Sequence, residues 1–183
     1  MGDRERIGGW IAVGYVTSET ALANGATYRA DPRADLHADA EATVEFARDV
    51  DTAGGAEAVR HAIGTYGAAL EIVDLARVPG EPAAVVAANV FHRAVAFAEL
   101  EAPPSGDVRV LVNGSVRAAG VWPHEVVARL AAAARLLSAV GERFRAGDRV
   151  ITGSIVQVPV RVSDVVVADF GGLADVRLRI DAT

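Results

Sequence analysis

Residues 146–180, AGDRVITGSIVQVPVRVSDVVVADFGGLADVRLRI, alternate short apolar runs with turn residues. Val, Ile and Leu dominate each run, and these residue types favour β-strands. Gly147 and Asp148 form the first turn signal. The stretch predicts three strands, RVIT (149–152), SIVQVPVRV (154–162) and DVVVADF (164–170), and a last strand within GGLADVRLRI (171–180).

Short strand patterns also dominate the rest of the chain. Asn113–Gly114, between DVRVLV and SVRAAG, is a strong signal for a two-residue hairpin. Pro123 opens an apolar pattern at helical spacing that predicts a helix to about Arg143. The other expected elements are a strand at Trp10–Tyr15, a polar loop from Thr17 to Asp35, a strand at Ala38–Phe46, a turn at Asp51–Gly55, a helix at Glu57–Tyr66, a strand at Gly67–Val78, a loop at 78–82, and an apolar stretch, Val85–Leu100, for which helix and strand remain alternatives. We therefore expect one β-rich α+β domain spanning residues 1–183.

The composition excludes several classes of function. The net charge of −6 argues against a nucleic-acid partner, because phosphate binding needs clustered positive charge. The chain has no cysteine, which excludes disulfides, thiolate metal sites and cysteine nucleophiles. It also has no lysine, since all 18 basic residues are arginine, and this excludes Schiff-base chemistry, a lysine base and a P-loop lysine. There is no GxSxG motif and no convincing Ser-His-Asp set.

The sequence carries no sign of a membrane partner. No apolar run approaches the roughly 20 residues that a membrane-spanning helix needs. The first ten residues, MGDRERIGGW, contain charges where a signal peptide would have its apolar region. We therefore expect a cytoplasmic protein.

Acidic residues within apolar strands are the main chemical signal. Glu71 lies in ALEIVDLAR (69–77), and Asp39, Glu41, Thr43 and Glu45 share one parity of the strand Ala38–Phe46, which places them on one face. Two carboxylates at i and i+2 and a third from another strand make an oxygen site of the kind that Mg²⁺ prefers. The alternative is a solvated acidic strand face with Glu71 on an edge strand.

Several segments resemble the fumarylacetoacetate hydrolase superfamily, in the branch of 2-keto-4-pentenoate hydratase and 4-oxalocrotonate decarboxylase. Residues 146–180 are similar to its C-terminal signature, and ALEIVDLAR resembles its ALEIxDxR strand. The remaining matches, in the same order as in the family, are VGYVTS (13–18) with KxGxTS, AANVF (87–91) with ADNAS, and NGSVRAAG (113–120) with an NG hairpin. The resemblance implies the mixed β-sheet roll or sandwich of the superfamily's C-terminal domain, with a few short helices.

The resemblance also implies a metal site. In the family, the Glu of the ALEI strand and an ExE pair on an earlier strand bind a divalent cation, usually Mg²⁺ or Mn²⁺. Asp39 and Glu41 match that pair in a register that continues without a gap into Arg48-Asp49-Val50, so the implied ligands are Asp39, Glu41 and Glu71. A second register, anchored on Phe46, would use Glu41 and Thr43 instead.

The chain departs from the family at several positions. The lysine of the KxG segment falls near Ala12, and the Asp of the ADN segment falls at Ala88, although Asn89 remains. Ser163 and Ala174 stand where the family usually has Gly. The N-terminal region and the loop before the ExE pair are shorter than usual, which implies that a lid and a charged substrate contact are missing.

Other polar residues complete the candidate site. Glu71, Arg77 and His92 are candidate catalytic residues; strand parity places Arg77, but not Asp74, on the side of Glu71, where it would bind a substrate carboxylate or neutralise the acidic cluster. Imidazole titrates near neutrality, so His92 and His124 are candidate general bases, but neither has a visible partner in the sequence, which favours a structural role for both. The candidate substrate-binding residues are Tyr15, Asn89, Thr152, Gly153 and Ser154, the last three through backbone amides or as a turn that needs Gly.

Three functions follow as hypotheses. The first is a metal-dependent lyase of the hydratase or decarboxylase type, in which the cation chelates a small 2-oxo or enolised acid and stabilises the enolate. The second is a related cyclase or isomerase of a biosynthetic pathway, with the metal optional and an open, apolar cavity. The third is a non-catalytic partner subunit, for which a collapsed pocket and a Glu71–Arg77 pair would be expected. Exposed apolar strands are compatible with a homodimer.

Overall fold

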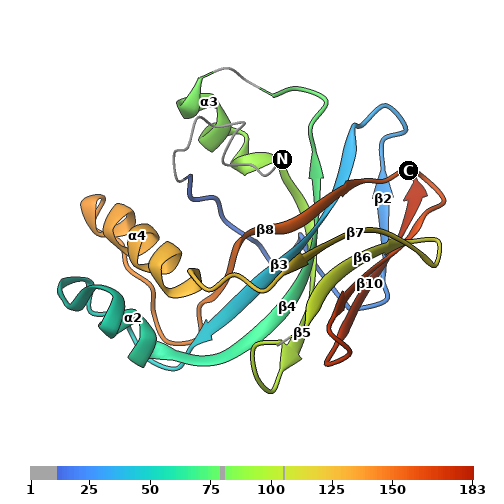
Figure 1. Cartoon of the computed structure of the whole chain (residues 1–183). Coiled ribbons are helices and arrows are strands. Elements are labelled where there is room, and N and C mark those ends of the chain that lie inside the picture. The colour runs from blue at the N-terminus through green and yellow to red at the C-terminus, as the bar shows by residue number, and fades with distance from the viewer. Residues whose placement is uncertain (1–11, 79–80, 105) are drawn as a thin grey trace.

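The computed structural model describes residues 12–78, 81–104 and 106–183. Within these described residues, ten strands form two five-stranded sheets, and the helices lie outside them (Figure 1). The first sheet has the order β1-β5-β4-β3-β8, and the second has the order β2-β10-β9-β6-β7. The strands are β1 (Ala21–Leu22), β2 (Thr27–Ala30), β3 (Leu36–Phe46), β4 (Ile63–Asp74), β5 (His92–Leu100), β6 (Asp107–Val112), β7 (Ser115–Val121), β8 (Arg149–Pro159), β9 (Val165–Phe170) and β10 (Asp175–Ala182). This is the mixed, β-rich α+β architecture that the sequence predicts.

The helices are short. They are α2 (Gly55–Ala62), α3 (Pro82–Ala87) and α4 (Val126–Ala139), with 3₁₀ turns η1 (Thr52–Gly54) and η2 (Asn89–Phe91). Helices α2 and α4 lie side by side at one end of the molecule (Figure 1). None of the helices in the described part of the chain is long and apolar enough to cross a membrane.

The core lies between the two sheets and is built by alternation along the strands. On β3 the residues of one parity, Ala38 to Phe46, are at most 1% exposed and belong to the main apolar cluster. Their partners on the second sheet include Val108, Val110, Val166, Ala168, Val176 and Leu178, all completely buried. Burying a Val, Leu, Ile or Phe side chain contributes about 1.5–3 kcal/mol, so this parity of β3 is fixed firmly. The acidic residues of opposite parity must therefore point away from the core between the sheets.

The tight hairpin predicted at Asn113–Gly114 is confirmed. Strands β6 and β7 pair antiparallel on either side of it, and both turn residues have positive φ, 52° and 78°. Such φ values are those of a type I′ turn, which suits Asn and Gly.

The sequence misplaces some elements near the N-terminus. The predicted strand Trp10–Tyr15 is wrong for residues 12–15, which are irregular, while Trp10 and Ile11 lie outside the described residues. The predicted loop from Thr17 to Asp35 contains β1 and β2. These strands pair in parallel with β5 and β10, which are distant in the sequence, so their own residues give only a weak signal.

Other boundaries also differ from prediction. The predicted helix Glu57–Tyr66 ends at Ala62, because Ile63 and the residues after it pair with β3. The helix predicted from Pro123 starts at Val126 and ends at Ala139. The apolar stretch 85–100 divides into the end of α3, the turn η2 and β5, and the predicted strands RVIT and SIVQVPVRV are one irregular strand, β8.

Candidate metal centre

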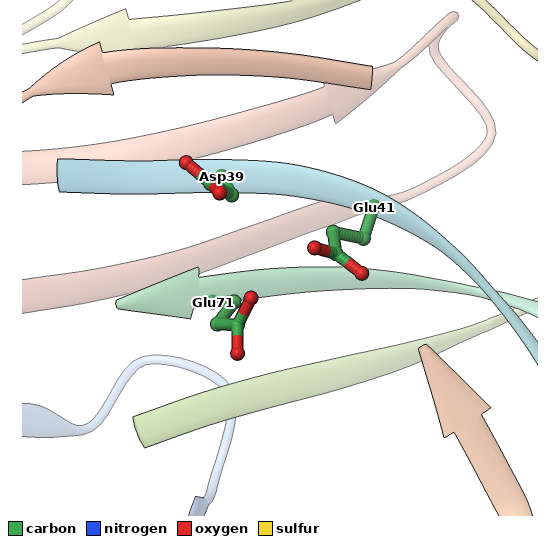
Figure 2. A group of neighbouring side chains, drawn as sticks. All are labelled: Asp39, Glu41 and Glu71. Carbon is green, nitrogen blue, oxygen red and sulfur yellow. The ribbon is translucent and has the colours of Figure 1, made fainter. Parts of the chain in front are cut away.

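Three buried carboxylates converge where β3 and β4 pair. Asp39 lies directly opposite Glu71, and Glu41 follows two residues later on the same face of β3 (Figure 2). One oxygen from each of the three carboxylates lies within 4.8 Å of those of the other two. Asp39, Glu41 and Glu71 are 0%, 2% and 7% exposed. The structure thus brings together the residues of the ungapped register.

Each carboxylate is held by a hydrogen-bond donor from a neighbouring strand. The side chain of Gln157 donates to Asp39 Oδ2 at 3.1 Å, and the backbone N–H of Gly153 donates to Glu41 Oε2 at 2.9 Å. His92 Nδ1 lies 2.6 Å from Glu71 Oε1. Hydrogen-bond donors behind metal-binding groups fix the orientation of those groups. Removal of such a donor typically weakens metal binding 10–100-fold.

An irregularity in β8 produces the contact with Glu41. The pairing of β3 with β8 shifts on both sides of Glu41, and β8 has extra residues at this point, around Thr152, Gly153 and Ser154. Gly153 has φ +96°, a conformation that Gly adopts without the strain of a side chain. The Thr152 hydroxyl donates to the carbonyl of Ala42 at 3.0 Å, which anchors the bulge. The three residues predicted to act through backbone amides thus lie beside the carboxylates, and the Gly153 amide faces Glu41 itself.

His92 has two partners that the sequence does not reveal. Its Nε2 lies 3.0 Å from the hydroxyl of Thr20, while Nδ1 faces Glu71. Burial, and secondarily the charge of Arg93, lowers the pKa of His92. A proton on Nδ1 lets the ring donate to Glu71, while the Thr20 hydroxyl beside Nε2 donates to the carbonyl of Thr17 at 3.1 Å. The expectation that His92 is alone is therefore wrong; it orients Glu71.

A cavity of about 1100 Å³ opens over the carboxylates. Glu41, Glu71 and His92 line it, whereas the completely buried Asp39 is not part of its surface. Apolar side chains of α4 and β5 also line it, with Leu130, Ala133, Leu137 and Phe97 among them. Pockets of about 300–1,000 Å³ hold drug-sized ligands, so the cavity has room for a substrate larger than a short 2-oxo acid.

Tyr15 and Asn89 lie together at the edge of this cavity. The side-chain amide of Asn89 accepts a hydrogen bond from the Tyr15 N–H at 2.7 Å and donates to the Tyr15 carbonyl at 2.8 Å. Asn89 thus holds the segment from Ala12 to Ser18 in the cavity wall, rather than offering a free amide. Ala12 also lines the cavity, where the resemblance would place a lysine.

Arg77 lies apart from this group. Strand β4 ends at Asp74, whose carboxylate accepts hydrogen bonds from the N–H groups of Asp35 and Ala76 and turns the chain. Strand parity therefore does not extend to Arg77, which is exposed and is not among the lining residues. His124 is exposed, and Thr43 of the alternative register packs against Gly67.

The sequence gives little indication of three further residues. Thr20 and Gln157 hold His92 and Asp39, and Arg129 of α4 lines the cavity beside Gly153. A polar Gln inside the apolar run SIVQVPV is a weak signal for a buried role. Thr20 and Arg129 have no marker, because the contacts depend on the packing of β1 and α4.

The three carboxylates fit a hard divalent cation. Like charges confined away from water repel one another, and a cation between them offsets that repulsion. Oxygens on opposite sides of Mg²⁺ are about 4.1 Å apart and those around Ca²⁺ about 4.8 Å, from the usual ligand distances. The limit of 4.8 Å within which the three carboxylate oxygens lie matches the Ca²⁺ spacing, and Mg²⁺ would need the oxygens no more than about 4.1 Å apart.

The sequence matches no protein-family model and no curated protein. Among solved structures, the chain is similar to 4-oxalocrotonate decarboxylase from Pseudomonas putida G7, in complexes with calcium and acetate (TM-score 0.81) and with magnesium and adipate (TM-score 0.82). The sequence identity is 22% in both cases. Each alignment covers 97% of this chain and, respectively, 72% and 73% of the decarboxylase chain.

Two other solved structures are also similar to the chain. One is 5-carboxymethyl-2-hydroxymuconate delta-isomerase from Mycobacterium smegmatis, with TM-score 0.69, 17% identity and coverage of 90% of this chain and 66% of that chain. The other is a fumarylacetoacetate hydrolase family protein from Yersinia pestis CO92, with TM-score 0.62, 19% identity and coverage of 88% and 81%. The chain therefore has the fold of the fumarylacetoacetate hydrolase superfamily, as its sequence motifs imply.

Proposed function

We propose that this chain is an enzyme that binds a divalent cation, Mg²⁺ or Mn²⁺, through Asp39, Glu41 and Glu71 and acts on a 2-oxo or enolisable carboxylic acid. The convergence of three buried carboxylates beside an open cavity supports the proposal most directly. The fold adds support, because similar structures include a decarboxylase in complex with magnesium and with calcium. The reaction class that we propose is a lyase of the hydratase or decarboxylase type.

Some residues of the chain orient the three carboxylates, and others line the cavity beside them. Gln157, Gly153 and His92 each hold one carboxylate oxygen, which directs the other oxygens of the cluster. When bound, the cation would chelate the carboxylate and the 2-oxo oxygen of the substrate and polarise its carbonyl group. Apolar side chains of α4 line part of the cavity, and an apolar, low-dielectric lining strengthens the electrostatic interactions near it.

The size of the cavity favours a second candidate, a cyclase or isomerase acting on a larger apolar substrate. Its volume of about 1100 Å³ exceeds what a short 2-oxo acid fills. The third hypothesis, a non-catalytic partner subunit, has less support. The cavity is open, and Glu71 contacts His92 instead of Arg77.

A proton-exchange assay tests the enolate that these reactions share. Hydratase, decarboxylase and isomerase chemistry of 2-oxo acids all pass through an enol or enolate, which exchanges a proton with the solvent at the carbon next to the 2-oxo group. In D₂O, with Mg²⁺ or Mn²⁺, the protein should catalyse exchange of that proton in one or more of a panel of 2-oxo acids, followed by NMR. Glu71→Gln should abolish the exchange, and Arg77→Ala should not. Exchange at the buffer rate for every acid in the panel would contradict the proposed function.

A further inference from the structure

The cavity extends from the carboxylate cluster along β3, and this part of it, between Glu41 and Glu45, is the arm. At its near end, Gly153 of β8 donates its N–H to Glu41. At its far end, Arg149 pairs with Glu45 at 2.7 Å. All four residues line the cavity. Glu45 comes four residues after Glu41 on the strand, so the arm is about 13 Å long at about 3.3 Å per residue.

Helix α4 has contacts at both ends of the arm. Near its start, Arg129 donates to the carbonyl of Thr152 at 3.2 Å, beside the near end. Toward its other end, the carbonyl of Leu137 accepts a hydrogen bond from the N–H of Glu142, in the loop that leads to the far end. The helix rises about 10 Å from Leu130 to Leu137, at about 1.5 Å per residue, which is comparable with the length of the arm.

The face of α4 that lines the cavity carries an apolar stripe with a small residue at its centre. Leu130, Ala133 and Leu137 are all lining residues, and their spacing of three and four places them on one face of the helix. All three also pack in the main apolar cluster, which fixes this face of the helix. The methyl group of Ala133 leaves space that any larger side chain would fill. Ala133 is therefore the position on α4 that controls the width of the arm.

Strand β5 adds an aromatic ring to the lining of the arm. Glu41 of β3 and Phe97 of β5 both pair with Ala69 of β4, so the three side chains lie on one face of the sheet. Phe97 lines the cavity, and the guanidinium of Arg149 lies 5.1 Å from the centroid of its ring. The apolar surface of Phe97 thus lies between the carboxylate cluster and the ion pair at the far end.

The charges around the cavity are balanced in pairs. Each of the four lining arginines has a carboxylate partner, in the pairs Arg129–Glu125, Arg143–Asp49, Arg145–Glu142 and Arg149–Glu45. A substrate group that enters the arm therefore meets apolar side chains and cations that are already paired. An additional charge is costly to bury in such surroundings, whereas each buried CH₂ group is favourable.

We propose that the arm binds an unbranched apolar tail of the substrate and that Ala133 determines which tails fit. The inference rests on the proposed function, because it assumes that the 2-oxo acid end lies at Asp39, Glu41 and Glu71. An extended alkyl chain advances about 1.25 Å per bond, from a bond length of about 1.5 Å and a tetrahedral angle, so the arm holds about eight to ten carbon atoms. The preferred substrate is therefore a medium-chain 2-oxo acid with an apolar end.

A series of unbranched 2-oxo acids, from 2-oxobutanoate to 2-oxodecanoate, tests the arm. In calorimetric titrations of the full chain at saturating Mg²⁺, each added CH₂ group should tighten binding about two- to fourfold, because complete burial of one contributes about fourfold. Ala133→Leu should bind 2-oxobutanoate as the wild type does and 2-oxodecanoate at least about tenfold more weakly. Ala128→Leu, the same change at an exposed position of α4 outside the lining, should bind both acids like the wild type.

Three results of this series would overturn the inference. The first is the same wild-type affinity for all chain lengths. The second is undiminished binding of 2-oxodecanoate by folded Ala133→Leu. The third is an equal loss of 2-oxodecanoate binding in Ala128→Leu, because that position does not line the cavity.

A second variant covers the case in which Ala133→Leu does not fold, since added volume can overpack α4 against the core. Leu137→Ala removes three carbon atoms from the lining instead of adding any. It should weaken the binding of 2-oxodecanoate about three- to tenfold and leave the affinity for 2-oxobutanoate unchanged. An unchanged affinity for 2-oxodecanoate, or an equal loss for both acids, would overturn the inference.

Failure of the arm and failure of the proposed function give different results. If 2-oxobutanoate binds in a Mg²⁺-dependent manner but affinity does not rise with chain length, the arm is wrong and the metal site stands. If affinity rises with chain length without Mg²⁺, decanoate binds as tightly as 2-oxodecanoate, and Ala133→Leu weakens both, the metal function is wrong and the arm stands.

Discussion

Glu41→Gln should stabilise the metal-free protein while it removes the stabilising effect of the metal. The oxygens of the three carboxylates lie within 4.8 Å of one another. At that distance, with an effective dielectric constant of about 20, two unit charges repel by about 3.5 kcal/mol. The amide of Gln keeps an oxygen for the Gly153 N–H and gains an NH₂ group that can donate to a neighbouring carboxylate.

The expected net gain is about 2 kcal/mol, because the hydrogen bonds to the cluster already offset part of the repulsion. In a chain of this length, this raises the melting temperature in chelator by about 4–8 °C. With a divalent cation at 100 times its dissociation constant, the wild type should gain about 2.7 kcal/mol, or about 5–11 °C, and Glu41→Gln should gain much less.

Glu45→Gln is the matched control on the same strand. Glu45 is 42% exposed and pairs with Arg149 at 2.7 Å, outside the cluster. Its loss should cost at most about 1 kcal/mol and should leave the metal effect intact. Differential scanning calorimetry measures both variants. A Glu41→Gln protein that melts below the wild type in chelator, or that keeps the full response to metal, would refute the reasoning.

Two further variants test the groups that hold the carboxylates. His92→Gln should weaken Mn²⁺ binding about 10–100-fold in calorimetric titrations, because Glu71 loses the group that orients it, whereas exposed His124→Gln should leave the affinity unchanged. Gly153→Ala should lower stability by about 1–3 kcal/mol in urea unfolding, because its φ of +96° strains any side-chain-bearing residue. Gly106→Ala, whose Cβ would meet nothing closer than 3.8 Å, should change stability little, and equal effects of the two glycine variants would contradict the assignment of strain.

Local patterns predict the parts of the fold in which neighbouring residues decide the conformation. The alternation along β3 separates a completely buried apolar face from Asp39, Glu41 and Thr43, and Asn113–Gly114 forms the expected turn. The two- and four-residue strands β1 and β2 escape prediction because distant partners stabilise them. That one domain spans residues 1–183 and that the protein forms a homodimer both stay predictions.

In the candidate site too, local sequence patterns predict some residues, and tertiary contacts place the others. Asp39 and Glu41 come together through period-two geometry, and the pairing of β3 with β4 brings Glu71 to them. The partner of His92 is set by a register shift between β4 and β5 next to Val73, which no local pattern shows. The prediction that Arg77 lies beside Glu71 is wrong because β4 ends at Asp74, whose carboxylate accepts hydrogen bonds from backbone amides. Strand parity does not include this tertiary effect.

Direct measurement of cation binding tests the central claim. Chelator-stripped protein titrated with Mn²⁺ in a calorimeter should bind one ion per chain, and Glu71→Gln and Asp39→Asn should each abolish that binding while Glu45→Gln retains it. The absence of saturable binding to the wild type, or the same affinity in Glu71→Gln, would contradict a metal centre built from Asp39, Glu41 and Glu71.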